Sequence, residues 1–94
     1  MKRVYVEEGI YLRINNKGNI DNKCFEVVKV RTKFDFNLAV KLFKKLHESF
    51  KQVYLYKGSN GYRVEYKSYH SNLYEAQAVK QMVEEVLEEF ENDK

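Results

Sequence analysis

The chain repeats one pattern of two strands followed by a helix. The segments that correspond to each other are Ile10–Ile14 with Val53–Tyr56, Phe25–Val27 with Tyr62–Val64, and the apolar triplet Ala39, Leu42 and Leu46 with Ala76, Val79 and Val83. An internal repeat constrains the organisation of a chain before any motif is considered. We therefore expect a single domain over residues 1–94, made of two pseudo-repeats at residues 3–50 and 52–92.

Hydrophobic periodicity indicates an α+β fold. Residues 3–7, 10–15, 25–31, 53–56 and 62–67 have strand character, whereas residues 38–50 and 76–90 carry apolar side chains at helical spacing. A helix with one apolar stripe must bury it against another layer. The expected fold is thus pseudo-repeated ββα units that form one antiparallel sheet of four or five strands. Both helices pack on one face, and the other face is open to water.

Local signals mark the ends of these elements. Asp35 or Asn37 can cap the first helix, and Asn72 with Glu75 has capping-box spacing before the second. Residues 57–61 form a hairpin loop in which Gly58 and Gly61 can take positive φ. Residues 66–72 show no clear further strand.

The charge is distributed unevenly along the chain. The net charge is +3, but residues 1–72 carry +8 and residues 73–94 carry −5. Such asymmetry bears on partners and association rather than on fold. It predicts a basic body and an acidic C-terminal helix.

Composition predicts a cytoplasmic protein that does not interact with membranes. There is no apolar run long enough to span a bilayer. Glu7 and Glu8 come too early for a secretory signal peptide. The single Cys24 cannot form an internal disulfide, as expected in a reducing compartment. Lys, Asn and Tyr are frequent while Pro and Trp are absent, which is typical of A/T-rich genomes. We expect that the protein comes from a phage or mobile element. A phage-encoded protein of this kind would act in the host cytoplasm.

The open sheet face is the first candidate site. Alternation places rings and cations there together, including Arg3 and Tyr5. Rings and guanidinium planes stack on bases, and cations replace the counterions of phosphates. The predicted nucleic-acid-binding residues are Tyr11, Arg13, Lys29, Arg31, Tyr54, Tyr56, Arg63 and Lys67. Tyr and Lys also suit an ordinary solvated strand. The adjacent Val27 and Val28 leave open which face Lys29 and Arg31 occupy.

The acidic helix is the second candidate site. Its predicted protein-binding residues are Glu84, Glu85, Glu88 and Glu89, which repel one another at i,i+4 spacing. Either the lysines of the first helix, Lys41, Lys44 and Lys45, offset this repulsion, or the acidic surface docks on a basic partner.

Signatures of catalysis or metal binding are missing from the sequence. His47, His70 and Cys24 are far apart in the chain, and there is no phosphate-binding glycine loop or nucleophile elbow. We expect a protein that is not an enzyme and uses no metal or cofactor.

The segment from Tyr54 to Ala76 has a short hairpin followed by a helix. Together with its flanking residues it makes up about half of the chain. In strand order and composition it resembles the arm-type DNA-binding domains of phage integrases and the AP2-like domains. That resemblance implies a sheet face placed in the major groove of DNA.

Three hypotheses follow. The first is a small protein that binds nucleic acid or a nucleoprotein complex through the basic, Tyr-rich sheet face. The alternative is a protein-binding inhibitor of a host defence system, similar to anti-CRISPR proteins, that acts through the acidic helix or the Tyr-rich face. The third is a homodimer formed edge to edge through an outer strand.

Overall fold

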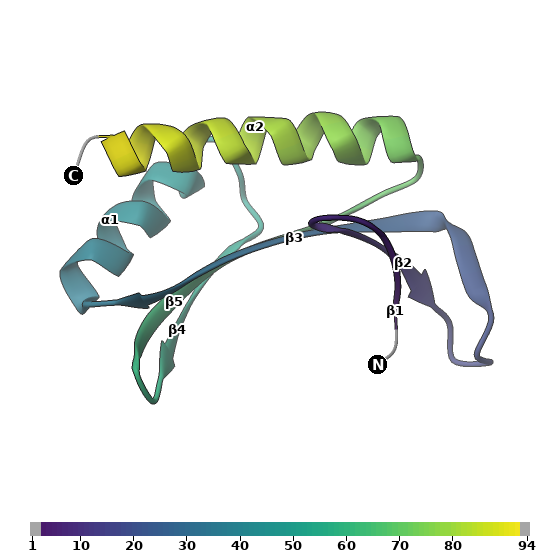
Figure 1. Ribbon diagram of the computed structural model, residues 1–94, viewed down its shortest axis with the longest axis horizontal. Helices are drawn as coiled ribbons and strands as arrows, with labels where there is room; N and C mark the ends of the chain where they lie inside the picture. The colour runs from purple at the N-terminus through teal and green to yellow at the C-terminus, as the bar shows by residue number, and fades with distance from the viewer. Residues whose placement is uncertain (1–2, 93–94) are drawn as a thin grey trace.

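The computed structural model describes residues 3–92 as one five-stranded sheet and two helices (Figure 1). In chain order the elements are β1 (Arg3–Glu7), β2 (Ile10–Ile14), β3 (Ile20–Phe34), α1 (Phe36–His47), β4 (Val53–Gly58), β5 (Gly61–His70) and α2 (Leu73–Asn92). The strand order is β1-β2-β3-β5-β4, and every neighbouring pair is antiparallel. The predicted α+β class and antiparallel sheet are confirmed, with five strands.

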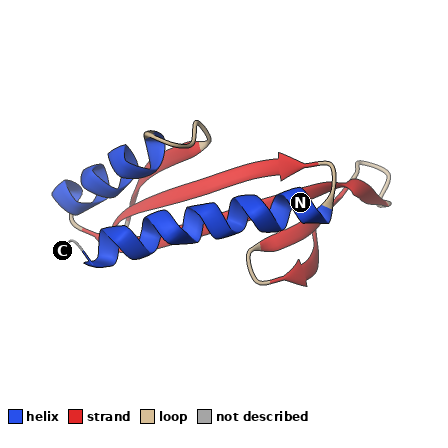
Figure 2. Ribbon diagram, turned by 90° about the horizontal axis from the view of Figure 1, so that it is seen from above, coloured by secondary structure: helices blue, strands red, loops and turns tan. Residues whose placement is uncertain are grey.

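Both helices lie on the same side of the sheet. Figure 1 shows α2 running along β3, and Figure 2 shows α1 beside the C-terminal half of α2. α2 contacts β3 and β5, whereas α1 contacts β4 and β5. In Figure 1 the β1–β2 and β4–β5 hairpins both descend from β3 on the side away from α2. The opposite face of the sheet is therefore left without a covering element among the described residues.

The core lies between the two helices and the sheet. Apolar side chains at helical spacing meet apolar side chains at strand spacing, as each element buries one face. The members with no exposed surface are Ile10, Val27, Ala39, Leu42, Ala76 and Val83, and around them lie Leu46, Phe50, Val53, Val64, Tyr66, Leu87 and Phe90. Since both helices and four strands share this cluster, the chain has one core.

The long strand β3 determines how the side chains divide between the two faces. Its register against β5 runs without interruption from Phe25 to Arg31 and shifts only between Arg31 and Phe34, where Lys33 has φ 67°. Val27 therefore points to the helices and Val28 to the other face. By the same alternation Lys29 and Arg31 follow Val27 to the helix face.

The predicted caps and turn are present, with small differences. The Asp35 side chain accepts a bond from the Leu38 N–H at 2.8 Å, and the Asn72 side chain accepts one from the Glu75 N–H at 2.8 Å. Gly61 takes a φ of 129° in the β4–β5 hairpin, whereas Gly58 does not have positive φ. The strand β5 continues to His70, beyond the predicted end at Lys67, because the longer strand β3 pairs with it as far as Phe25 opposite His70.

The internal repeat remains a prediction. Two strands and a helix do occur twice in succession, but β1 has no counterpart in the second half. The helices also differ in length, with 12 residues in α1 and 20 in α2. Neither of the described helices is apolar enough over a sufficient length to cross a membrane.

Candidate functional site

The side chains that point away from the helices form a surface that we call the open face. Its aromatic and charged members are Arg3, Tyr5, Tyr11, Arg13, Glu26, Tyr54, Tyr56, Arg63, Glu65, Lys67 and Tyr69, and Val28 and Val30 of β3 lie between them. Four of its tyrosines are strongly exposed: Tyr5 at 66%, Tyr54 at 44%, Tyr56 at 41% and Tyr69 at 49%. Large aromatic side chains seldom remain this accessible together unless they meet a partner. The open face is therefore the candidate site.

Six of the eight predicted nucleic-acid-binding residues lie on this surface. They are Tyr11, Arg13, Tyr54, Tyr56, Arg63 and Lys67. They come from both halves of the chain, with β2 supplying two and the β4–β5 hairpin four. Strand alternation alone was sufficient to group them, since each strand has one clearly apolar face.

The other two predicted residues lie on the opposite face, which corrects the grouping. The Lys29 Nζ is 2.9 Å from a Glu84 carboxylate oxygen on α2, and the Arg31 Nε is 3.6 Å from Glu91. Lys29 is also largely buried, with 11% of its side chain exposed. The reason is the regular register of β3 beside β5, which sends both cations toward α2.

Each arginine of the open face lies over a tyrosine ring. The guanidinium carbon is 4.3 Å from the ring centroid for Arg3 on Tyr11, 5.3 Å for Arg13 on Tyr69, and 4.7 Å for Arg63 on Tyr56. Such contacts contribute about 0.5–1 kcal/mol at exposed sites. They hold the cations in the plane of the surface. Tyr69 was missed in the sequence because β5 was expected to end before it.

A carboxylate lies at the centre of the open face. Glu26 is only 5% exposed, and it accepts a hydrogen bond of 2.7 Å from Arg3 and lies 3.4 Å from the Lys67 Nζ. Burial opposes the ionisation of Glu26, but Arg3, the Tyr69 hydroxyl and Lys67 together hold its pKa below the ordinary value. The nearby Glu26 carboxylate in turn raises the pKa of Lys67.

This cluster means that the open face is a mixed surface, not a purely basic one. Besides Glu26 it contains Glu65, whose carboxylate is 4.0 Å from Arg63. Sequence reasoning had considered only the cations and rings of this face. The alternation that selected Arg63 and Lys67 would equally have selected Glu65 between them.

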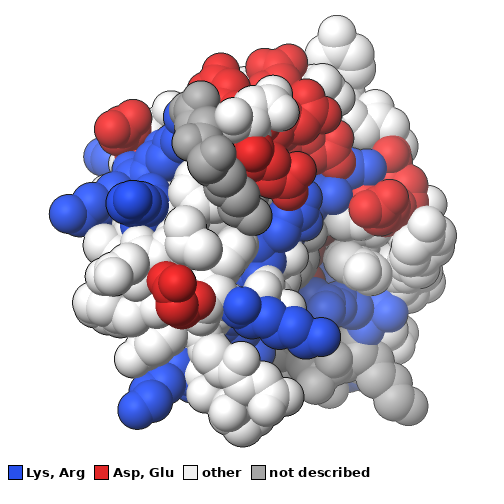
Figure 3. Space-filling view, turned by 60° about the vertical axis from the view of Figure 1, so that its left-hand side comes forward, with Lys and Arg blue, Asp and Glu red and all other residues white. Residues whose placement is uncertain are grey.

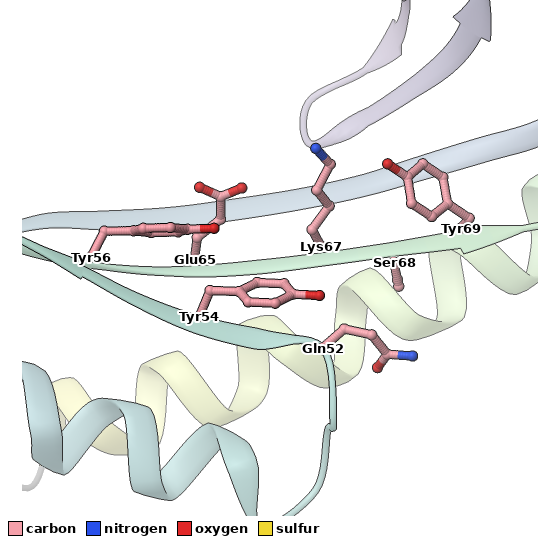
Figure 4. Close-up of a pocket in the computed structure, with 7 residues that line it drawn as sticks. All are labelled: Gln52, Tyr54, Tyr56, Glu65, Lys67, Ser68 and Tyr69. Atoms are coloured by element: carbon pink, nitrogen blue, oxygen red, sulfur yellow. The ribbon is translucent and has the colours of Figure 1, made fainter.

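A hollow opens at the outer part of this surface, beside β4 and β5 (Figure 4). It measures about 510 Å³ and is lined by Gln52, Tyr54, Tyr56, Glu65, Lys67, Ser68 and Tyr69. Figure 4 shows the rings of Tyr54 and Tyr56 lying along the sheet, while Lys67 and Tyr69 rise from it on the side away from the helices. The hollow thus has an aromatic floor and a wall that carries a cation.

The acidic side chains of α2 are partly neutralised within the chain. Glu84 pairs with Lys29, Glu91 with Arg31, and Glu89 with Lys45 at 3.8 Å. In Figure 3 most acidic side chains of the face shown gather in its upper part, with basic side chains next to them. The expected ion pair with a lysine of α1 is formed by Lys45. The sequence did not predict the ion pairs of Glu84 and Glu91 with cations of β3. Glu85 and Glu88 lack an ion pair in the described part of the chain.

The histidines and the cysteine do not come together. His47 stacks on Phe43 with 5.3 Å between the centroids, and His70 lies 2.7 Å from the Ser68 hydroxyl. Cys24 is half-buried and free. Within residues 3–92 there is no group of three His, Cys, Asp or Glu that could hold a metal ion.

No family model, curated protein or solved structure matches this chain.

Proposed function

We propose that the protein binds nucleic acid, alone or in a nucleoprotein complex, through the open face. The proposal rests on one observation. Exposed tyrosines and arginines from β1, β2, β4 and β5 lie together on the uncovered side of the sheet. Nucleic acids present two features to a protein, a polyanionic backbone and flat bases. A surface that alternates cations with rings offers a partner for each.

The balance of charge on this face supports the proposal. Four cations share it with two carboxylates, and the carboxylates pair with Arg3, Lys67 and Arg63. Arg13 takes part in none of the ion pairs between described residues, and its guanidinium lies over the Tyr69 ring. Its charge is the most readily available to a phosphate. The acids limit the strength of non-specific attraction, so binding at moderate affinity is the expectation.

Three further statements belong to the same proposal. The two ββα pseudo-repeats supply one half of the surface each, Tyr11 and Arg13 from the first and Arg63 and Lys67 from the second. The protein acts by binding and without catalysis. Its composition supports an origin in a phage or mobile element and a place of action in the host cytoplasm.

The experiment that tests the proposal is a salt titration of binding. Fluorescence anisotropy with labelled DNA and RNA, single-stranded and duplex, is measured between about 50 and 200 mM salt. The double variant Arg13→Gln, Arg63→Gln should bind more weakly. The slope of log K against log[salt] should fall by ~1.4 for single strands or ~1.8 for duplex if both cations contact phosphate.

A charge-matched control separates the site from general electrostatics. Lys41 and Lys44 are exposed on α1, on the helix side of the molecule. Lys41→Gln, Lys44→Gln removes the same two charges and should leave affinity and slope nearly unchanged. Equal loss in both double variants would show that binding is diffuse, and no binding by the wild type would refute the proposal.

The second candidate function, a protein-binding inhibitor of a host defence system, rests on α2. Its supporting observation is an exposed Met82, at 51%, on the same helix as Glu85 and Glu88, which form no ion pair with another described residue. Glu84 and Glu89 hold Lys29 and Lys45, so reversing all four acids would disturb folding as well. The sharper test is Glu85→Lys, Glu88→Lys, which should abolish inhibition of the defence system and spare nucleic-acid binding.

A further inference from the structure

We infer that the hollow beside β4 takes bases of a single-stranded nucleic acid, which it holds spread apart on Tyr54 and Tyr56. This inference rests on the proposed function and names the class of ligand for its outer part. The relevant features are the spacing of the two rings, the cation next to them and the position of the hollow at the edge of the sheet.

The spacing of the Tyr54 and Tyr56 rings is too wide for two successive stacked bases of a duplex to contact one ring each. The centroids of Tyr54 and Tyr56 are 6.3 Å apart and their planes differ by 30°, so the two rings form a widely spaced, near-parallel pair, and both lie along the sheet in Figure 4. Successive bases in one strand of B-DNA rise by only about 3.4 Å. Two neighbouring bases that each cover one ring must therefore be separated from each other. A single strand permits this, because its bases are free to unstack.

The surroundings of the rings suit a nucleotide. The Arg63 guanidinium lies over the Tyr56 ring, so a base at that position can stack on the guanidinium plane and the ring together. No cation of the described residues lies over the Tyr54 ring. Lys67 stands in the wall of the same hollow, where the Glu26 carboxylate favours its charged form. A strand whose bases face Tyr54 and Tyr56 can thus place its phosphates near Lys67.

Polar groups at the hollow can contact the base edges. Glu65 and Gln52 line it beside the rings. A carboxylate accepts hydrogen bonds from exocyclic amino groups, and a duplex presents these groups only in its grooves. Because β4 is an edge strand, no further strand of the described structure bounds the hollow on that side.

The test compares ligands that differ only in their bases. The probes are a labelled single strand of about ten nucleotides, its duplex, and an abasic strand of the same length. The wild type should bind the single strand most tightly. Tyr54→Leu should lose ~10-fold in affinity for it, since a stacked base is lost, and hardly any for the abasic strand. Tyr54→Phe, which keeps the ring, should retain the wild-type affinity.

Controls and opposite outcomes separate this inference from the proposed function. Tyr74 is exposed on α2, at 82%, so Tyr74→Leu removes an exposed ring elsewhere and should not change binding. If the duplex binds as well as the single strand and Tyr54→Leu has no effect on either, the inference is overturned while nucleic-acid binding stands. If none of the three probes binds at low salt, both fail together.

Discussion

At the scale of single residues, Glu26 is the group on which the open face is organised. Glu26 lies on β3, which is between β1 and β5 in the sheet, and its carboxylate pairs with Arg3 of β1 and with Lys67 of β5. A carboxylate this little exposed is favourable only when its oxygens are hydrogen-bonded or ion-paired. The same contacts keep the surrounding cations and Tyr69 in place, so a structural acid shapes a surface proposed to bind an anion.

The Glu26 cluster predicts a pH-dependent contribution to stability. Glu26→Gln should lower the free energy of unfolding at neutral pH by about 1–3 kcal/mol, at the lower end because Arg3 and Lys67 are partly exposed to solvent. The folded-state pKa lies below the ordinary value of 4.5, so this stabilisation is present above that value and is lost as pH falls through the folded-state pKa.

Urea unfolding of wild type and Glu26→Gln, from about pH 7 to about pH 3, measures the effect. The difference between the two proteins should be largest near neutral pH and shrink under acid conditions. A difference that stays constant over this range would contradict the assignment of an ionised Glu26.

A second residue-scale prediction concerns Gly61. A Cβ at this position would lie 2.9 Å from the Phe34 carbonyl oxygen, and the φ of 129° suits only glycine. Gly18 also has positive φ, at 83°, but a Cβ there meets nothing within 4 Å. Gly18→Ala should cost about 1–2 kcal/mol from backbone conformation alone. Gly61→Ala should cost about 2–4 kcal/mol, since the backbone oxygen cannot move aside cheaply.

Thermal unfolding followed by circular dichroism compares these two variants directly. Equal destabilisation would mean that the close approach of the β4–β5 hairpin to β3 is not a constraint on the fold.

At the scale of elements, α2 is matched to β3 by charge as well as by apolar packing. Its buried Val83 and Leu87 contact the core, while Glu84 and Glu91 reach Lys29 and Arg31 at the margin of that contact. This explains why a helix with acidic residues near its C-terminus, an unfavourable place for them, is retained next to a basic sheet.

The pairing predicts different consequences for two neighbouring acids. Glu84→Gln and Glu88→Gln each remove the same i,i+4 repulsion, because these residues repel each other. Glu84 alone also has Lys29 at 2.9 Å. We expect Glu84→Gln to destabilise the protein by about 1 kcal/mol, and Glu88→Gln to be neutral or stabilising by a few tenths of a kcal/mol.

Chemical denaturation of both variants at low and high salt gives the comparison. The difference between them should narrow at high salt, as expected for partly exposed charges. If the two variants had the same stability, the Lys29–Glu84 pair would contribute nothing.

At the scale of the whole molecule, one core supports a sheet whose other side stays uncovered. Leu42 on α1 and Val83 on α2 belong to the same buried cluster. Unfolding should therefore be a single cooperative transition in which both helices and the sheet are lost together. Leu42→Ala should lower the free energy of unfolding by about 2–5 kcal/mol without splitting the transition.

Far-ultraviolet circular dichroism and tyrosine fluorescence are two suitable probes, because the chain has no Trp and Tyr66 is buried in the core. Their midpoints should coincide in the wild type and in Leu42→Ala. Separate midpoints would mean that the two halves of the chain unfold independently, as two self-sufficient repeats would.

The edges of the sheet belong to the same scale. β1 and β4 are the outer strands, and each has backbone groups available for a further strand. The hypothesis of an edge-to-edge homodimer stays a prediction, which light scattering at increasing protein concentration addresses.

Local sequence patterns are sufficient to predict most of the elements and to group most residues of the open face. Periodicity of two and of 3.6 residues depends on which side chains are apolar, and this can be read without coordinates. It located the central parts of the strands, both helices and the caps at Asp35 and Asn72, whereas β3 and β5 extend beyond the residues predicted for them. It also brought Tyr11, Arg13 and Arg63 to one surface, because their strands alternate clearly.

The faces of β3 and the ion-pair partners of the charged residues depend on tertiary packing. Val27 and Val28 are both apolar, so local pattern could not say which points inward, and the register against β5 settles it. That register places Lys29 and Arg31 under α2 and Glu26 in the middle of the open face. Ion pairs such as Lys29–Glu84 join residues that are far apart in the chain, and their formation depends on how the sheet and helix pack, which no local signal encodes.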